Sequence, residues 1–158
     1  MSPARAVVGV VLPAVLVLTG CAGEDEGPGT VRVEAGAVDV TAQATQGCDD
    51  GEQVRYEAAP PVVEVAPDSD ITLTVPGSVA ERGWAVQVFD VDLDTVLVEA
   101  IEAPEGEDRF TVLDGTGDLP PAFYLLVVED KGGDCGVWSR AWPIGVIRAG
   151  GEIQPPES

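Results

Sequence analysis

From Val31 onward, apolar and polar residues alternate along the chain, and turn-forming residues recur about every ten residues. This two-residue period predicts extended strands, because successive side chains of a strand point to opposite faces. Clusters of Gly, Pro and Asp end most runs, as expected where tight turns join short strands. The runs that we expect to form strands cover residues 31–34, 38–44, 62–66, 71–75, 84–91, 95–100, 108–113, 123–129 and 137–148.

The number and spacing of these runs favour an all-β fold, an immunoglobulin-like β-sandwich of about 7–9 short strands. Trp84 lies on a middle strand and suits the space between two packed sheets. Residues 123–129 form the most apolar run, which predicts a central strand. Pro143 lacks a backbone N–H and should mark a bulge or an edge. Only residues 76–83 have the composition of a helical turn.

The first twenty residues have the pattern of a bacterial export signal. Arg5 precedes a largely apolar run, Ala6–Thr19, of 14 residues. As a helix this run would be about 21 Å long, which suits a signal peptide better than a membrane span of roughly 30 Å. The run ends in Leu18-Thr19-Gly20-Cys21, which resembles a lipobox. We therefore expect cleavage before Cys21, with cleavage at another small residue or an uncleaved anchor as the alternatives.

Lipidation of Cys21 would attach the protein to the extracytoplasmic face of the cell membrane. Its thiol would receive diacylglycerol as a thioether, and two or more acyl chains suffice for stable anchoring. The expected organisation is a signal peptide (1–20), the lipidated cysteine with a flexible acidic tether (21–30), the sandwich (31–148) and a flexible C-terminal tail (149–158).

Two cysteines remain once Cys21 carries lipid. Cys48 and Cys135 form an even pair in an oxidising compartment, so we expect a disulfide. Cys48 follows the first predicted hairpin and Cys135 lies in a loop, so the bond should join strand ends rather than span the core. The chain has no histidine and no Cys-x-x-Cys motif, so metal binding or redox chemistry by these cysteines is poorly supported.

The charge and the missing residue types exclude several function classes. With 28 acidic and 8 basic residues among 158, the formal net charge is −20, which excludes nucleic acid as a partner. Without histidine, a Ser-His-Asp triad, a histidine base and histidine-ligated zinc are all impossible. We therefore predict that the protein is not an enzyme and needs no cofactor, with Ca²⁺ as the one exception considered.

Several segments together resemble a family of small actinobacterial lipoproteins. They are the lipobox, VTAQATQGC (40–48), VEVAPDSDITLTVPGSVAERGWAVQVFD (63–90), PPAFYLLVVED (120–130) and WSRAWPIGVI (138–147). The resemblance covers most of residues 31–148 and rests on strands and turns rather than on catalytic signatures. It implies a surface lipoprotein whose domain, of unknown function, has an immunoglobulin-like fold, and it supplies no activity or site residues.

Two groups of residues are candidates for binding. Asp90, Asp92 and Asp94 alternate along an extended segment and could bind Ca²⁺, although the spacing that follows departs from an EF-hand loop; a solvated acidic hairpin is the alternative. Trp138 and Trp142 are four residues apart, which would put both on one face of a strand. They could form an aromatic platform for sugar or peptide, or they could be part of the core.

The predicted function is that of a monomeric, membrane-anchored binding module that is not catalytic and recognises an envelope protein or polymer. The alternatives are a Ca²⁺-dependent adhesion or wall-associated module and an accessory subunit of an envelope enzyme.

Overall fold

Alternation of apolar and polar side chains produces a mostly-β structure. The computed structural model describes residues 27–113, 119–129, 135–148 and 151–153. Eleven strands and one short helix form within these ranges. They are β1 (Thr30–Ala35), β2 (Val38–Gln43), β3 (Gln46–Asp49), β4 (Glu52–Arg55), β5 (Val62–Glu64), β6 (Ile71–Thr74), α1 (Gly77–Arg82), β7 (Trp84–Phe89), β8 (Val96–Glu102), β9 (Arg109–Leu113), β10 (Ala122–Glu129) and β11 (Arg140–Ile147).

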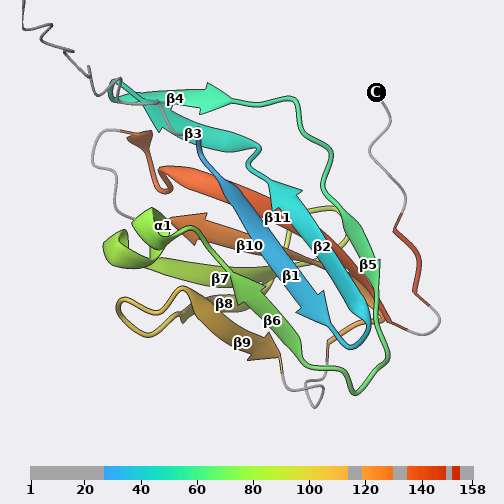
Figure 1. Ribbon diagram of the computed structural model, residues 1–158. Coiled ribbons are helices and arrows are strands. Elements are labelled where there is room, and N and C mark those ends of the chain that lie inside the picture. Colours follow the sequence, from blue (N-terminus) through green and yellow to red (C-terminus); the bar gives the residue numbers. More distant parts are fainter. Residues whose placement is uncertain (1–26, 114–118, 130–134, 149–150, 154–158) are drawn as a thin grey trace, which may run out of the picture.

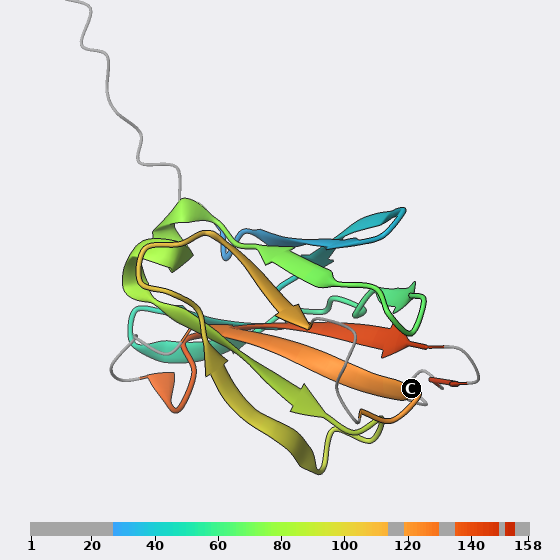
Figure 2. The same ribbon diagram turned by 90° about the horizontal axis from the view of Figure 1, so that it is seen from below.

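The strands form two sheets that pack face to face in a sandwich-like arrangement (Figure 1, Figure 2). The four-stranded sheet has the order β2-β1-β6-β9, and the seven-stranded sheet has the order β4-β3-β11-β10-β7-β8. The seventh strand of the larger sheet, β5, runs parallel to the second half of β11, while the other pairings are antiparallel. We call the face of the larger sheet that meets the smaller sheet its inner face, and the opposite face its outer face.

The core lies between the two sheets. Its apolar side chains come from alternate positions of both sheets, as the two-residue period requires. Val31 and Val33 of β1 meet Leu125 and Val127 of β10 in one cluster, together with Trp84 and Trp142. The burial of Trp84, Val86 and Val88 on one face of β7 confirms the prediction for that strand.

The apolar run predicted to be central is central. Strand β10 lies between β11 and β7, and both of its faces are largely covered. Its odd-numbered residues from Phe123 to Val127 enter the main core, while Val128 packs in a second, smaller cluster with Ala85 and Ala141. The outer face of the larger sheet therefore has apolar packing of its own.

The helical turn expected at residues 76–83 is α1. Pro76 stands at the N-terminal cap, and Val79 and Ala80 are buried against the core. Gly83 ends the helix with φ 93°, a backbone angle that favours glycine, and its N–H donates to the Val79 carbonyl. The chain then turns directly into β7.

Pro143 is tolerated in the interior strand β11 because no strand pairs with β11 at that position on one side. The Gly145 N–H donates to the Pro61 carbonyl on the side of β11 that faces away from β10. By strand alternation the Pro143 nitrogen faces the same side. There β3 pairs only at Ala141, and β5 begins to pair at Gly145. The proline therefore lies where no neighbouring strand needs its missing N–H, so the expected edge exists, but only locally.

The predicted strand count was too low. Nine of the observed strands match predicted runs, but the hairpin of β3 and β4 was missed. Its register pairs Gln46 with Arg55 and Asp49 with Glu52, around a turn in which Asp50 and Gly51 both have positive φ. This hairpin forms one edge of the larger sheet and contributes to the candidate site.

The described part of the C-terminal segment lies against the domain. The Gly151 N–H donates to the Arg148 carbonyl, and the Ile153 side chain lies close to Gly145 on β11. These contacts cover the end of the outer face at which Tyr124 is buried, and that burial raises the pKa of its hydroxyl.

Candidate functional site

The predicted disulfide is present. Cys48 lies on β3, Cys135 lies in the segment before β11, and their Cα atoms are 5.7 Å apart. Both ends belong to the same side of the molecule, so the bond does not cross between the sheets. It attaches the edge hairpin β3–β4 to the start of β11, as the sequence predicted.

The acidic loop between β7 and β8 does not gather its carboxylates around a cation site. The Asp90 carboxylate accepts the backbone N–H groups of Asp94 and Thr95, at 3.0 and 3.2 Å. These hydrogen bonds hold the pKa of Asp90 below its ordinary value. Asp92 and Asp94 are exposed, and the described residues contain no group of three or more His, Cys, Asp and Glu side chains able to hold a metal.

The same loop holds a strained residue. Leu93 has φ 60°, which is uncommon for a side chain without a local hydrogen-bonding group. Its N–H donates to the Asp90 carbonyl, so Asp90 fixes the loop through both its backbone and its side chain. The loop directs the Leu93 side chain to the outer face of the larger sheet, where it lines a cavity.

The prediction that Trp138 and Trp142 share one face is wrong. Trp142 is fully buried in the main core, and its indole N–H donates to the Gly29 carbonyl at 3.1 Å. Trp138 precedes the first residue of β11 and packs on the outer face against the cluster that contains Ala141. Strand alternation does not extend back to Trp138, because β11 begins only at Arg140.

A buried acidic residue at the end of the inner face was not anticipated. Glu129, only 2% exposed, ends β10 and forms ion pairs with Arg82 of α1 and Arg140 of β11. Arg140 thus continues the inner face beyond Trp142, but it does so as an ion-pair partner rather than as part of an open platform. Two arginines against one carboxylate compensate the buried charge, so that removing an arginine would leave this charge less well paired.

The outer face has a cavity of about 310 Å³, near the lower limit of typical ligand sites. Its walls are Phe89, Leu93, Leu126, Trp138, Ala141 and Pro143, with Thr45, Gln46 and Arg55 on the side of the edge hairpin. Gln46 is fixed because its side-chain amide donates to the Trp138 carbonyl at 2.7 Å. We call this the outer-face cavity.

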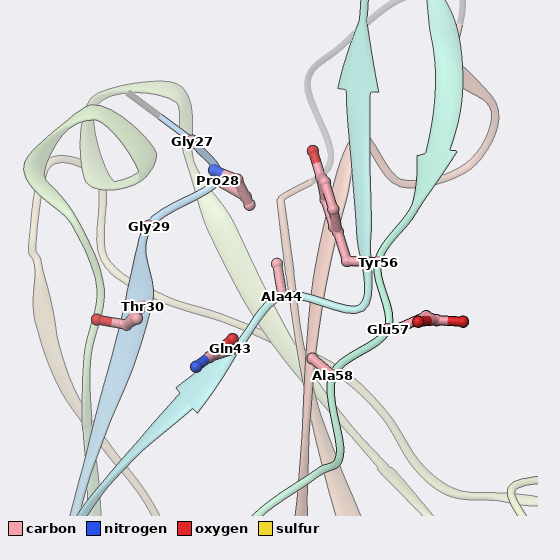
Figure 3. Close-up of a pocket in the computed structure, with 9 residues that line it drawn as sticks. All are labelled: Gly27, Pro28, Gly29, Thr30, Gln43, Ala44, Tyr56, Glu57 and Ala58. Atoms are coloured by element: carbon pink, nitrogen blue, oxygen red, sulfur yellow. The ribbon is translucent and has the colours of Figure 1, made fainter. Parts of the chain in front are cut away.

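A second cavity, of about 500 Å³, opens beside the first described residues (Figure 3). Pro28 and Tyr56 lie on its two sides, and Ala44 lies between them, while the Glu57 carboxylate points away. Gly29, whose carbonyl accepts a hydrogen bond from the Trp142 indole N–H, also lines this cavity. This cavity is larger but lacks a cationic group among its lining residues, and we call it the entry cavity.

The predicted signal peptide and lipidation site lie outside the described ranges. Cys21 and the whole signal peptide belong to residues 1–26, whose structure is not described. Along residues 27–113, 119–129, 135–148 and 151–153, no helix is long and apolar enough to cross a membrane.

Comparisons with protein-family models, with curated proteins and with solved structures found no match. The resemblance to small actinobacterial lipoproteins therefore stays a prediction from the quoted segments.

Proposed function

We propose that this protein is a lipid-anchored binding module on the extracytoplasmic face of a bacterial cell membrane. The observation that carries the proposal is the lipobox, Leu18-Thr19-Gly20-Cys21, at the end of an apolar run of signal-peptide length. The Cys48–Cys135 disulfide supports it, because such bonds persist in oxidising compartments.

An immunoglobulin-like topology is part of this proposal. The order β8-β7-β10-β11, with β5 parallel to β11, corresponds to a C′-C-F-G sheet that carries a short A′ strand. The pairing of β6 with β9 corresponds to the B–E pair of the opposite sheet. In this interpretation β3 and β4 are an added hairpin, and the disulfide attaches that hairpin instead of linking strands B and F.

Binding suits the entry cavity and the outer-face cavity better than glycoside cleavage does. Glycoside cleavage by carboxyl groups needs a pair of them across one site. The entry cavity is lined by a single carboxylate, Glu57, which points away from it, and the outer-face cavity is lined by none. Apolar walls with a few polar groups are typical of a ligand site.

The anchor is tested by the mass and location of the mature protein. We expect the full chain, expressed in a bacterial host, to sediment with membranes and to carry a diacylglycerol on Cys21. Cys21→Ser should abolish the adduct and release the protein from the membrane fraction.

A matched control separates the anchor from the other thiols. The Cys48→Ser/Cys135→Ser variant makes the same chemical change elsewhere and should keep the lipid. A wild-type protein without a lipid adduct would contradict the proposal.

A further inference from the structure

The outer-face cavity has one wall that differs chemically from the rest. Phe89, Leu126, Trp138 and Pro143 present aromatic and aliphatic surface, and Arg55 brings a guanidinium group to the side of the edge hairpin. The register explains why the two meet: Arg55 pairs with Gln46, and Gln46 pairs with Ala141, so all three share the outer face. The cavity therefore joins an apolar wall to a cation.

Arg55 is the arginine without an ionic or aromatic partner in the part of the chain that the structure describes. The other described arginines are engaged: Arg32 with Asp39, Arg82 and Arg140 with Glu129, Arg109 with Glu34, and Arg148 over the Phe123 ring. In a chain with 28 acidic residues, an unpaired arginine beside an apolar cavity is unexpected on charge alone. It leaves a charge that a ligand can complement.

The Asp90 loop holds one wall residue of this cavity in place. Leu93 lines the cavity with φ 60°, and two backbone hydrogen bonds to the Asp90 carboxylate hold the loop in that conformation. Backbone strain of this kind persists only where the surroundings over-determine it, and it concentrates at ligand sites. The acidic loop thus positions an apolar wall residue.

We propose that the outer-face cavity binds a small organic carboxylate whose apolar body is about the size of one aromatic ring with a short chain. The body packs between Trp138, Leu126 and Leu93, and the carboxylate accepts hydrogen bonds from the Arg55 guanidinium. This assignment rests on the proposed binding function and specifies its ligand class. The cavity volume of about 310 Å³ has room for a body of this size.

The carboxylate should dominate the selectivity. A charge-assisted pair with a guanidinium is about twice as strong as a neutral hydrogen bond, whereas the apolar wall treats a carboxylic acid and its amide alike. We therefore expect the cavity to prefer a carboxylate over the isosteric amide by about tenfold in dissociation constant.

Calorimetric titration of the full chain in the Cys21→Ser background tests the assignment, because no acyl chain then competes for the cavity. The probes are 3-phenylpropionate and its neutral isostere 3-phenylpropanamide. We expect 3-phenylpropionate to bind with a dissociation constant of about 1 mM or tighter, and the amide to bind about tenfold more weakly. Equal affinities, or no binding of either probe, would overturn the assignment.

Two variants locate the interaction. Arg55→Gln should remove the tenfold preference and keep the weak amide binding, and it should fold because Arg55 is exposed. Arg32→Gln removes the same charge from the other sheet and should leave both affinities unchanged. If Arg32→Gln lowers the carboxylate affinity as much as Arg55→Gln does, the preference is a long-range charge effect and the assignment fails.

The failure of this inference and that of the anchor are distinguishable. Titration in the Cys21→Ser background does not depend on lipid, and the mass of the wild-type chain does not depend on the cavity.

Discussion

The two faces of the larger sheet are built from the same strands but differ in how completely they are filled. On the inner face, Trp142 is fully buried and donates its indole N–H to Gly29. On the outer face, Trp138 is only partly buried and lines a cavity beside the unpaired Arg55. Strand β10 shows the same contrast, with Leu125 buried and its neighbour Leu126 at the cavity. The inner face forms the main core, whereas the outer face leaves apolar surface and a charge that we propose a ligand uses.

The largest expected effect is a difference in unfolding free energy between variants of the two tryptophans. Trp142→Ala should lower the free energy of unfolding by about 3–5 kcal/mol, because it leaves a large cavity in the core. Trp138→Ala should cost about 1 kcal/mol, because the side chain is only partly buried. Urea unfolding of both variants measures the difference, and equal losses would show that the outer face is also essential core.

The disulfide tests whether the edge hairpin belongs to the fold or to the site. The Cys48→Ser/Cys135→Ser variant should lose about 2–4 kcal/mol of unfolding free energy, because the disulfide joins residues that are 87 positions apart in the sequence. Because the bond attaches β3 and β4, the same variant should also weaken 3-phenylpropionate binding through Arg55. Undiminished binding with lowered stability would mean that the hairpin keeps its position without the bond.

The smallest expected effect concerns the loop that carries Leu93. Hydrogen bonds from the backbone N–H groups of Thr95 and, to a lesser extent, Asp94 lower the pKa of Asp90 in the folded state, so this group stabilises the fold above its unfolded pKa. That contribution is lost as pH falls through the folded pKa. Asp90→Asn should therefore destabilise the protein at neutral pH and have less effect in acid.

Urea unfolding of the wild type and of Asp90→Asn, at neutral pH and in acid, measures this effect. Asp92→Asn, which removes the same charge from the same loop, is the control. A pH-independent loss for Asp90→Asn would contradict the role of the ionised carboxylate.

Most of the fold could be predicted because its strands are regular. The burial alternation of β7 and the central position of β10 followed from apolar periodicity, and the pairing of Cys48 with Cys135 followed from cysteine counting. The hairpin of β3 and β4 could not be predicted in this way. Its residues, QGCD and EQVR, contain almost no apolar alternation, because the two residues that β3 buries, Gln46 and Gly47, have no apolar side chain and β4 is mostly exposed.

The site was less predictable for the same reason. The cavity combines Arg55 from the missed hairpin with Leu126 from β10 and Leu93 from a loop, and only tertiary pairing brings these together. The tryptophan prediction failed because alternation was extended to Trp138, which lies before the strand. A signal for the Asp90 turn was present, since aspartate often caps the backbone of tight turns.

The indole N–H resonances of the three tryptophans test the central claim most directly. In the Cys21→Ser background, titration with 3-phenylpropionate should shift the Trp138 resonance in a ¹H–¹⁵N spectrum. The Trp142 and Trp84 resonances should stay in place, because these indoles donate to the Gly29 and Glu107 carbonyls inside the fold. A shift of Trp142 without one of Trp138 would place the ligand at the entry cavity, which Gly29 lines, and would contradict the account.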